Sequence, residues 1–279
     1  MWTDSLPDWF AEHGRHHLPW RLTTDPWSIL VSEVMLQQTS VGRVLPRWSR
    51  FLCRWPDADH CAAATLADVL REWQGMGYPR RARALWLAAA RVAAEGWPTD
   101  EASLRTLPGV GAYTARALLA FSDVGVAVAS PRDVNVGRVA ARAALGREPA
   151  QARVTALDTV LSDSRPHGMP LRDYTYALFD VGTLHCRSQP RCEGCPLAPS
   201  CAFRGRGVTA QPGRRTPYEG SLRQLRGAIL AAVLDNPTLT CASLREAVSG
   251  VAGATPQRFD EAVAGLAMDG LLPSDVGVC

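Results

Sequence analysis

Four cysteines lie within sixteen residues of the sequence, in the segment VGTLHCRSQPRCEGCPLAPSC. They are Cys186, Cys192, Cys195 and Cys201, with the spacing Cys-x5-Cys-x2-Cys-x5-Cys. Four thiolates this close in sequence can surround one metal centre, either a 4Fe-4S cluster or a tetrahedral zinc ion, and spacing alone does not choose between them. Four buried thiols without metal are the alternative, which a loop rich in Pro and Arg does not favour. The other four cysteines are scattered, so the cluster indicates metal ligands before disulfides.

Two acidic residues stand in apolar, helix-like surroundings, Glu33 in ILVSEVMLQQTSVGRV and Asp133 in SPRDVNVGRVAAR. A carboxyl group that loses water has a raised pKa and can act as a general acid, whereas one kept ionised beside N–H donors can stabilise a cation. Taken singly, each could instead cap a helix or form a salt bridge.

The segment LPGVGAYTA, residues 107–115, places two glycines between a helix end and the next helix start. Glycine allows positive φ and close approach to a ligand, and the first N–H groups of a helix attract anions. The segment therefore predicts a helix-hairpin-helix motif that binds one DNA phosphate. Such a contact would position the DNA without recognising its sequence. An ordinary glycine turn is the alternative.

All 30 basic residues are arginine, so no lysine side chain can form a Schiff base. The net charge is +3, and residues 221–279 carry four arginines against six acids, which leaves the body of the chain basic. A basic body is compatible with phosphate binding.

Helical periodicity dominates the sequence, and strand-like alternation is nearly absent before residue 205, which predicts an all-α fold. The segments 65–73, 80–94, 114–121, 174–184, 222–234, 242–249 and 256–268 are expected to be helices. Three helices and a trailing extended segment after residue 219 resemble a small winged-helix domain, and a compact helical cap of another kind is the alternative. No apolar run approaches the roughly 20 residues that span a bilayer, and we expect a cytoplasmic protein.

Together these segments resemble the MutY adenine DNA glycosylases of the helix-hairpin-helix base-excision superfamily, in a short form similar to that of some actinobacteria. The resemblance runs from about residue 18 to 201, through LPWR, VSEVMLQQT, WQGMGYPRRAR, LPGVGAYTA, DVNVGRVAAR and the cysteine loop. It implies a 4Fe-4S cluster and two helical lobes. The expected parts are a cluster lobe (1–21 and 131–204), a six-helix lobe (22–130), a linker (205–218) and the winged-helix-like domain (219–279).

The resemblance also implies catalytic roles. Glu33 matches the acid that protonates adenine at N7, and Asp133 matches the carboxylate that supports the oxocarbenium ion as the glycosidic bond breaks. Asn135 and Tyr113 match residues that hold this site together. Tyr113 also stands where lyase members of the superfamily carry a lysine, so we expect base release without strand cleavage.

On the DNA side, the resemblance implies a flipped adenine taken from an A:8-oxoG or A:G mispair in double-stranded DNA. Gln38 and Tyr78 match residues that wedge into the duplex, and Trp20 and Arg21 match the lining of the adenine pocket. The complete set of expected DNA contacts is Trp20, Arg21, Gln37, Gln38, Thr39, Tyr78, Gly109, Val110 and Gly111. The enzyme is expected to be a monomer located with the nucleoid.

The chain departs from the family pattern in three places. The first cysteine interval has five residues instead of six, the segment VAVASPR before Asp133 is unusually polar, and about sixty residues after the linker are too few for a Nudix-like domain that inspects 8-oxoguanine. The opposite-base preference therefore stays open. Two other functions are considered: a thymine or uracil mismatch glycosylase of the same fold, and a non-catalytic iron-sulfur protein that binds DNA.

Overall fold

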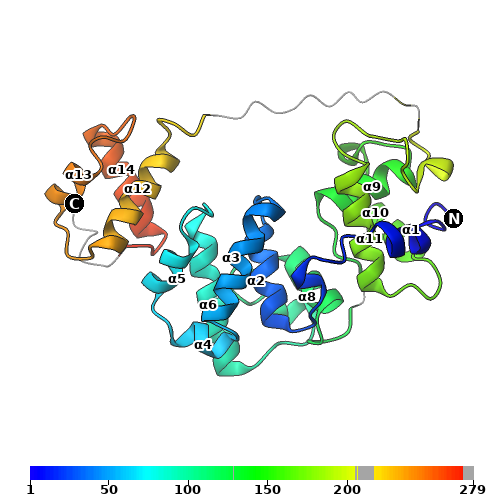
Figure 1. The fold of residues 1–279 in the computed structure, drawn as a ribbon, viewed down its shortest axis with the longest axis horizontal. Helices are drawn as coiled ribbons and strands as arrows, with labels where there is room; N and C mark the ends of the chain where they lie inside the picture. The colour runs from blue at the N-terminus through cyan, green and yellow to red at the C-terminus, as the bar shows by residue number, and fades with distance from the viewer. Residues whose placement is uncertain (128, 205, 207–216, 273–279) are drawn as a thin grey trace. The chain divides into compact units, whose positions relative to one another are not determined.

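The computed structural model describes residues 1–127, 129–204, 206 and 217–272 (Figure 1). Within these residues the chain forms helices and turns and contains no strand, which confirms the expected all-α class. None of the helices in this described part of the chain is long and apolar enough to cross a membrane.

The first of two compact units, called unit 1, combines Met1–Val34 with Gly96–Pro212. Helix α2 (Pro26–Leu36) begins in this unit and ends just beyond it. The other helical elements of unit 1 are α1 (Leu6–His13), η1 (Pro19–Arg21), α7 (Glu101–Leu104), α8 (Ala112–Phe121), α9 (Val134–Ala143), η2 (Pro149–Gln151), α10 (Val154–Asp163), α11 (Leu171–Leu184) and η3 (Ala198–Ser200).

The second compact unit, called unit 2, combines Met35–Glu95 with Gly213–Cys279. Its helices are α3 (Val41–Arg54), α4 (Ala58–Ala63), α5 (Leu66–Trp73), α6 (Pro79–Glu95), α12 (Leu222–Asp235), α13 (Cys241–Ala247) and α14 (Pro256–Met268). Helix α6 packs against α4 and α5, and α12 packs against α13 and α14.

Every helix expected from periodicity is present, with boundaries that differ by a few residues: α5, α6, α8, α11, α12, α13 and α14. The expected linker falls mostly on residues 205 and 207–216, and the end of the expected extended segment falls on residues 273–279; both lie outside the described residues. The four-part division and the winged-helix interpretation stay predictions.

Helices α9 and α11 form the centre of unit 1 and pack against each other. Buried apolar residues recur on each at spacings of three and four, which gives each helix one continuous apolar face. On α9 these are Val136, Val139, Ala140 and Ala143, and on α11 they are Tyr174, Ala177, Leu178 and Val181. This packing fixes the start of α9, where Asp133 is the N-cap residue.

Candidate active site

The four predicted catalytic side chains meet in unit 1, where Asn135 is joined to Asp133 by a side-chain hydrogen bond. Glu33 on α2 is only 7% exposed, and the hydroxyl of Tyr113 on α8 donates a hydrogen bond to its carboxyl group. Asp133, at the start of α9, lies close enough for its charge to act on both Glu33 and Tyr113. Residues 100 positions apart in sequence thus form one largely buried polar site.

Burial gives the acidic groups of this site unusual proton affinities. It raises the pKa of Glu33 to about 7; the hydrogen bond from Tyr113 opposes this change, and the charge of Asp133 adds to it. Burial and the charges of Glu33 and Asp133 raise the pKa of Tyr113 well above its ordinary value. At neutral pH, Glu33 is therefore partly protonated, and Tyr113 remains a hydrogen-bond donor.

The carboxylate of Asp133 is held by three donors. Its Oδ1 accepts hydrogen bonds from the backbone N–H groups of Asn135 (2.9 Å) and Val136 (2.7 Å), as an N-cap residue does. Its Oδ2 accepts one from the side-chain amide of Asn135 (2.8 Å). Burial raises the pKa of Asp133, while these donors and the charge of Arg138 act in the opposite direction. The donors favour the ionised form and fix its orientation.

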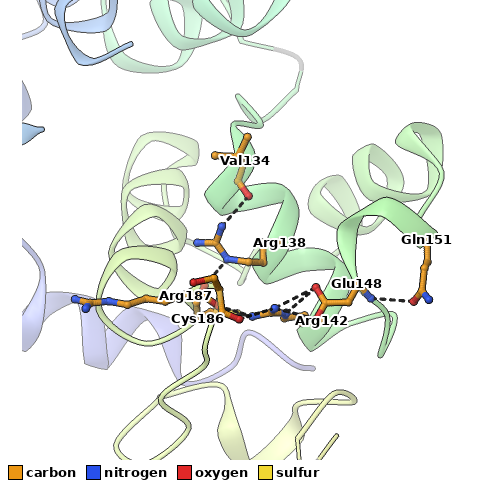
Figure 2. A network of polar contacts seen from close by, with 8 residues as sticks. Val134, Arg138, Arg142, Glu148, Gln151, Cys186 and Arg187 are labelled. Carbon is orange, nitrogen blue, oxygen red and sulfur yellow. Dashed lines mark hydrogen bonds and ion pairs between the residues drawn. The ribbon is translucent and has the colours of Figure 1, made fainter. Parts of the chain in front are cut away.

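Arg138 connects Asn135 to the cysteine segment, and Figure 2 shows its contacts with Val134 and Cys186. Its guanidinium group donates to Oδ1 of Asn135 (2.7 Å), to the carbonyl of Gly182 (3.1 Å) and to the carbonyl of Cys186 (2.5 Å). A chain of hydrogen bonds therefore runs from Asp133 through Asn135 and Arg138 to the first residue of the cysteine cluster.

Gly182 allows Asn135 to take this position. A Cβ atom on Gly182 would lie 2.9 Å from Cβ of Asn135, which is closer than such atoms approach. We therefore expect Gly182→Ala to displace Asn135 and to slow base release about tenfold or more, since small misplacements in an active site are costly. Single-turnover kinetics measures this effect. Unchanged kinetics in a folded variant would show that the orientation of Asn135 does not matter.

The four clustered cysteines line one pocket in unit 1, together with Arg142, Leu197 and Phe203. Burial raises the pKa of Cys195 to about 11, and the other three thiols are close enough to contribute to this increase. Within the described residues, no three His, Cys, Asp or Glu side chains are arranged to hold a single metal ion. The four thiols line the same pocket, and this all-sulfur set fits an iron-sulfur cluster.

Arg142 holds both ends of the cysteine segment, and Figure 2 shows it beside Cys186, Arg187 and Glu148. Its side chain is 2% exposed, lies 3.9 Å from Sγ of Cys186, and donates to the carbonyls of Arg187 (2.5 Å) and Ser188 (3.2 Å). Its own carbonyl lies 4.0 Å from Sγ of Cys201. The carboxylate of Glu148 binds the guanidinium group at 2.9 Å. The shortened first interval is therefore supported by an arginine on α9.

We expect Arg142→Met to lower the free energy of unfolding by about 2 kcal/mol, because the change leaves Glu148 without its cation and three acceptors without a donor. This expected loss of stability is kept small because the side chain of Glu148 remains 18% exposed to solvent. Urea unfolding measures the loss, and a double variant with Glu148→Gln should recover part of it. Equal stability of Arg142→Met and the wild type would contradict this assignment.

The two residues expected in the adenine pocket are buried in unit 1. Trp20 is 4% exposed, and Arg21 forms a two-point ion pair with Asp180 through contacts of 2.7 and 2.9 Å. Arg15 binds the same carboxylate at 2.5 Å. Burial alone would raise the pKa of Asp180, but donation from Arg21 and Arg15 lowers it. Nε of Arg21 is a buried donor without a partner, so the site retains one free N–H group.

The glycine segment forms a turn between α7 and α8. Gly109 has a φ of 77°, which favours glycine, and Gly111 is the N-cap residue of α8. Both glycines are exposed, whereas Val110 is buried and its N–H donates to the carbonyl of Leu107. Val110 therefore anchors the turn, and the two glycines present the backbone to solvent.

The expected wedge residues lie in unit 2 and share an unusual backbone conformation. Gln38 (φ 56°) and Tyr78 (φ 51°) are the two non-glycine residues with positive φ in the described part of the chain. Arg81 holds both turns: it donates to the carbonyl of Gln37, and its guanidinium carbon lies 4.9 Å above the ring of Tyr78. The hydroxyl of Thr39 also bonds to the carbonyl of Gln37 (3.3 Å). Strained residues of this kind often occur at functional sites.

Sequence reasoning missed Arg81, Arg138, Arg142 and Asp180. The spacing of Arg138 and Arg142, four residues apart on an otherwise apolar helix, was a usable signal because such residues share one helix face. Asp180, buried in the middle of α11, carried no comparable signal, since its partners lie 159 and 165 residues away.

The family model and two similar relatives of this chain point to the same family. Residues 31–159 match the model of the HhH-GPD superfamily of base excision DNA repair proteins. The adenine DNA glycosylase of Mycolicibacterium smegmatis is 41% identical over 275 residues, which cover 96% of this chain and 91% of that protein. The adenine DNA glycosylase of Mycobacterium tuberculosis is 42% identical over 237 residues, which cover 81% of this chain and 76% of that protein.

Two solved structures share the fold. A thermostable thymine-DNA glycosylase matches with a TM-score of 0.64 and 25% identity, over 72% of this chain and 94% of that chain. A trapped endonuclease III–DNA covalent intermediate matches with a TM-score of 0.60 and 22% identity, over 72% of this chain and 92% of that chain. Both confirm the helix-hairpin-helix glycosylase fold expected from the motifs. With the sequence relatives above, they show that the chain belongs to the adenine DNA glycosylase family of the HhH-GPD base excision DNA repair superfamily.

Proposed function

We propose that this protein is a DNA N-glycosylase that removes adenine mispaired with 8-oxoguanine or guanine during base excision repair. The observation that carries the proposal is the meeting of Glu33, Tyr113 and Asp133 in one largely buried site. It is supported by 41% identity to an adenine DNA glycosylase over most of the chain.

In the proposed reaction, Glu33 donates a proton to N7 of adenine and so makes the base a better leaving group. A general acid works best when its pKa lies near the working pH, and the pKa of Glu33 is about 7. Tyr113 orients the carboxyl group through its hydrogen bond. It also remains neutral itself, so it does not compete for the proton.

Asp133 stabilises the positive charge that develops on the deoxyribose. As the bond between base and deoxyribose breaks, positive charge develops on the sugar ring, and a nearby carboxylate lowers the energy of that state. The three hydrogen bonds to Asp133 hold its carboxylate in one orientation before the reaction begins. Asn135 acts as its positioning residue.

The DNA-binding part of the proposal rests on the turns of both units. Gly109 and Gly111 present backbone to a phosphate, Gln38 and Tyr78 act as wedge residues, and Trp20 and Arg21 line the pocket for the flipped adenine. The unpaired Nε–H group of Arg21 supports that last role, because a buried donor gains free energy when it finds an acceptor.

A second candidate is a thymine mismatch glycosylase, which the match to the thermostable thymine-DNA glycosylase favours. Duplexes containing A:8-oxoG, A:G, T:G or U:G distinguish the two when base loss is revealed by alkali cleavage. We expect cleavage at adenine in the first two duplexes only. Cleavage at thymine or uracil with adenine left intact would replace the proposal with this second candidate, and no base loss from any duplex would favour a non-catalytic iron-sulfur protein.

The product is expected to be an abasic site in an unbroken strand. Tyr113 cannot form an imine, and the sequence holds no lysine side chain that could. Gels run without alkali should show intact strands while gels run after alkali show cleavage. Strand breaks that appear as fast as base loss would contradict this expectation.

We also propose that the four clustered cysteines hold a 4Fe-4S cluster. Bound there, the cluster would supply a structural centre for the segment between Cys186 and Cys201. Arg142 and the carbonyl contacts of Arg138 hold the ends of that segment. Iron and acid-labile sulfide measured per chain test the assignment: four of each are expected, whereas one zinc per chain would overturn it.

A further inference from the structure

The unusually polar segment before Asp133 ends in Ser-Pro-Arg, and both polar residues of this tripeptide have fixed partners in unit 1. Ser130 is 6% exposed, and its hydroxyl shares a hydrogen bond of 3.0 Å with the buried hydroxyl of Thr175 on α11. The chain that enters α9 is therefore attached to α11 three residues before the proposed catalytic carboxylate.

Arg132, the residue directly before Asp133, binds a second helix. Its Nε donates a hydrogen bond to Oδ1 of Asp158 on α10 at 2.8 Å. The aliphatic part of its side chain passes beside α9, because a Cβ atom on Gly137 would lie 3.7 Å from Cγ of Arg132, an ordinary contact distance. The side chain of Arg132 is thus held by both α9 and α10.

Asp158 is itself held by α8, the helix that follows the glycine turn. Nη1 of Arg116 on α8 lies 3.6 Å from Oδ2 of Asp158, and Nε of Arg116 donates to Glu101 on α7 at 3.0 Å. The side chains of Arg116, Arg132 and Asp158 are 23% to 31% exposed, so solvent screens their charges only in part. One network of ion pairs therefore joins α7, α8 and α10 to the residue that precedes Asp133.

We propose that Arg132 and Asp158 are positioning residues, whose ion pair fixes the backbone that enters α9 and thereby the orientation of the Asp133 carboxylate. Asp133 is the N-cap residue of α9, and an N-cap side chain reaches the N–H groups of its helix only from a suitable backbone conformation. Arg132 shares a peptide bond with Asp133, so a shift of its backbone reaches the carboxylate directly. Small displacements of a catalytic group are costly. The inference rests on the proposed role of Asp133 in adenine release.

Two variants of the full chain, Arg132→Met and Asp158→Ala, break the pair from its two sides. Each should slow adenine release about three- to tenfold in single turnovers with saturating enzyme, whereas the affinity for an A:8-oxoG duplex should stay within about threefold. The double variant should be no slower than the slower single variant, because both changes break one interaction. The matched control is Glu95→Gln, which breaks the ion pair with Arg91 (3.0 Å) on α6 and should leave the rate unchanged.

A second measurement does not depend on base release. The backbone N–H groups of Asn135 and Val136 donate to the Asp133 carboxylate, so their exchange with deuterium reports how firmly that carboxylate is held. Exchange followed at single amides by NMR should be about threefold faster or more in Arg132→Met and in Asp158→Ala than in the wild type. Exchange in α14 should be the same in all three proteins.

Three results would overturn the inference. An unchanged rate of adenine release together with lower stability in urea would show that the pair contributes only to folding. Weaker DNA binding by Arg132→Met with an unchanged rate at saturation would show that Arg132 contacts phosphate instead. Slow release with unchanged exchange of the two N–H groups would show that the loss of rate does not come from the orientation of Asp133.

Two further provisions keep the test decisive. If either variant fails to fold, Asp158→Asn replaces it, because asparagine keeps the size of the side chain and removes its charge; the same directions of change are expected. A wild-type enzyme that releases no adenine would refute the proposed function itself, and the exchange measurement would still decide whether the ion pair holds Asp133.

Discussion

Replacing Glu33 with glutamine is expected to slow adenine release by about 10³-fold or more, because the amide cannot give up a proton to the base. Glutamine has nearly the same shape as glutamate, and its amide oxygen can still accept the hydrogen bond from Tyr113. Binding to an A:8-oxoG duplex should therefore stay within a few-fold of the wild-type affinity. Single-turnover rates and fluorescence anisotropy measure the two effects separately.

The matched control for this experiment is Glu12→Gln, which removes an exposed carboxylate from α1 at the same cost in charge. It should leave both rate and affinity unchanged. If Glu33→Gln released adenine at more than about a tenth of the wild-type rate, Glu33 would not be the acid. Equal loss of binding and of base release would instead indicate that the substitution damages the fold.

The same substitution is expected to stabilise the protein at high pH. The pKa of Glu33 is raised from its ordinary value of 4.5 to about 7 in the folded state, so the folded state binds this proton more tightly than the unfolded chain does. Stability therefore falls as pH rises from about 4.5 to about 7, and above that range the folded state carries the full cost, of about 3 kcal/mol at most. Glu33→Gln removes this cost because the amide has no charge to bury.

Urea unfolding at pH 8 and pH 5 measures the difference. We expect Glu33→Gln to exceed the wild type by up to about 3 kcal/mol at pH 8 and by less than about 1 kcal/mol at pH 5. The buried acid therefore lowers the stability of the folded protein, and this loss of stability is a consequence of its proposed function. A variant that is less stable than the wild type at pH 8 would show that Glu33 is not held in costly surroundings.

Much of this site could be predicted from the sequence because local signals were strong. Asp133 precedes a helical pattern and is of a residue type that caps helices, and it is the N-cap residue of α9. Gly109 stands in a turn signal between two helical patterns, and it has the positive φ that such a turn needs. Each of these features depends on residues close by in the chain, which is the distance over which sequence patterns carry information.

The missing parts depend on contacts between distant segments. Arg138 is an ordinary exposed-looking arginine in the pattern DVNVGRVAAR, and only the packing of α9 on α11 brings it to Gly182 and Cys186. Arg132 looks like a surface arginine until Asp158, from a later helix, accepts its hydrogen bond. Periodicity predicts which face of a helix is buried, but it does not name the partner across that face.

The central claim is that the base released is adenine and that the mispair with 8-oxoguanine presents it. The most direct measurement incubates the full chain at pH 7 with a duplex whose adenine opposite 8-oxoguanine carries an isotope label, and identifies the free base by mass spectrometry. A T:G duplex with labelled thymine serves as the matched control. We predict labelled adenine from the first duplex and no labelled thymine from the second. Labelled thymine without labelled adenine, or no labelled base from either duplex, would contradict the account.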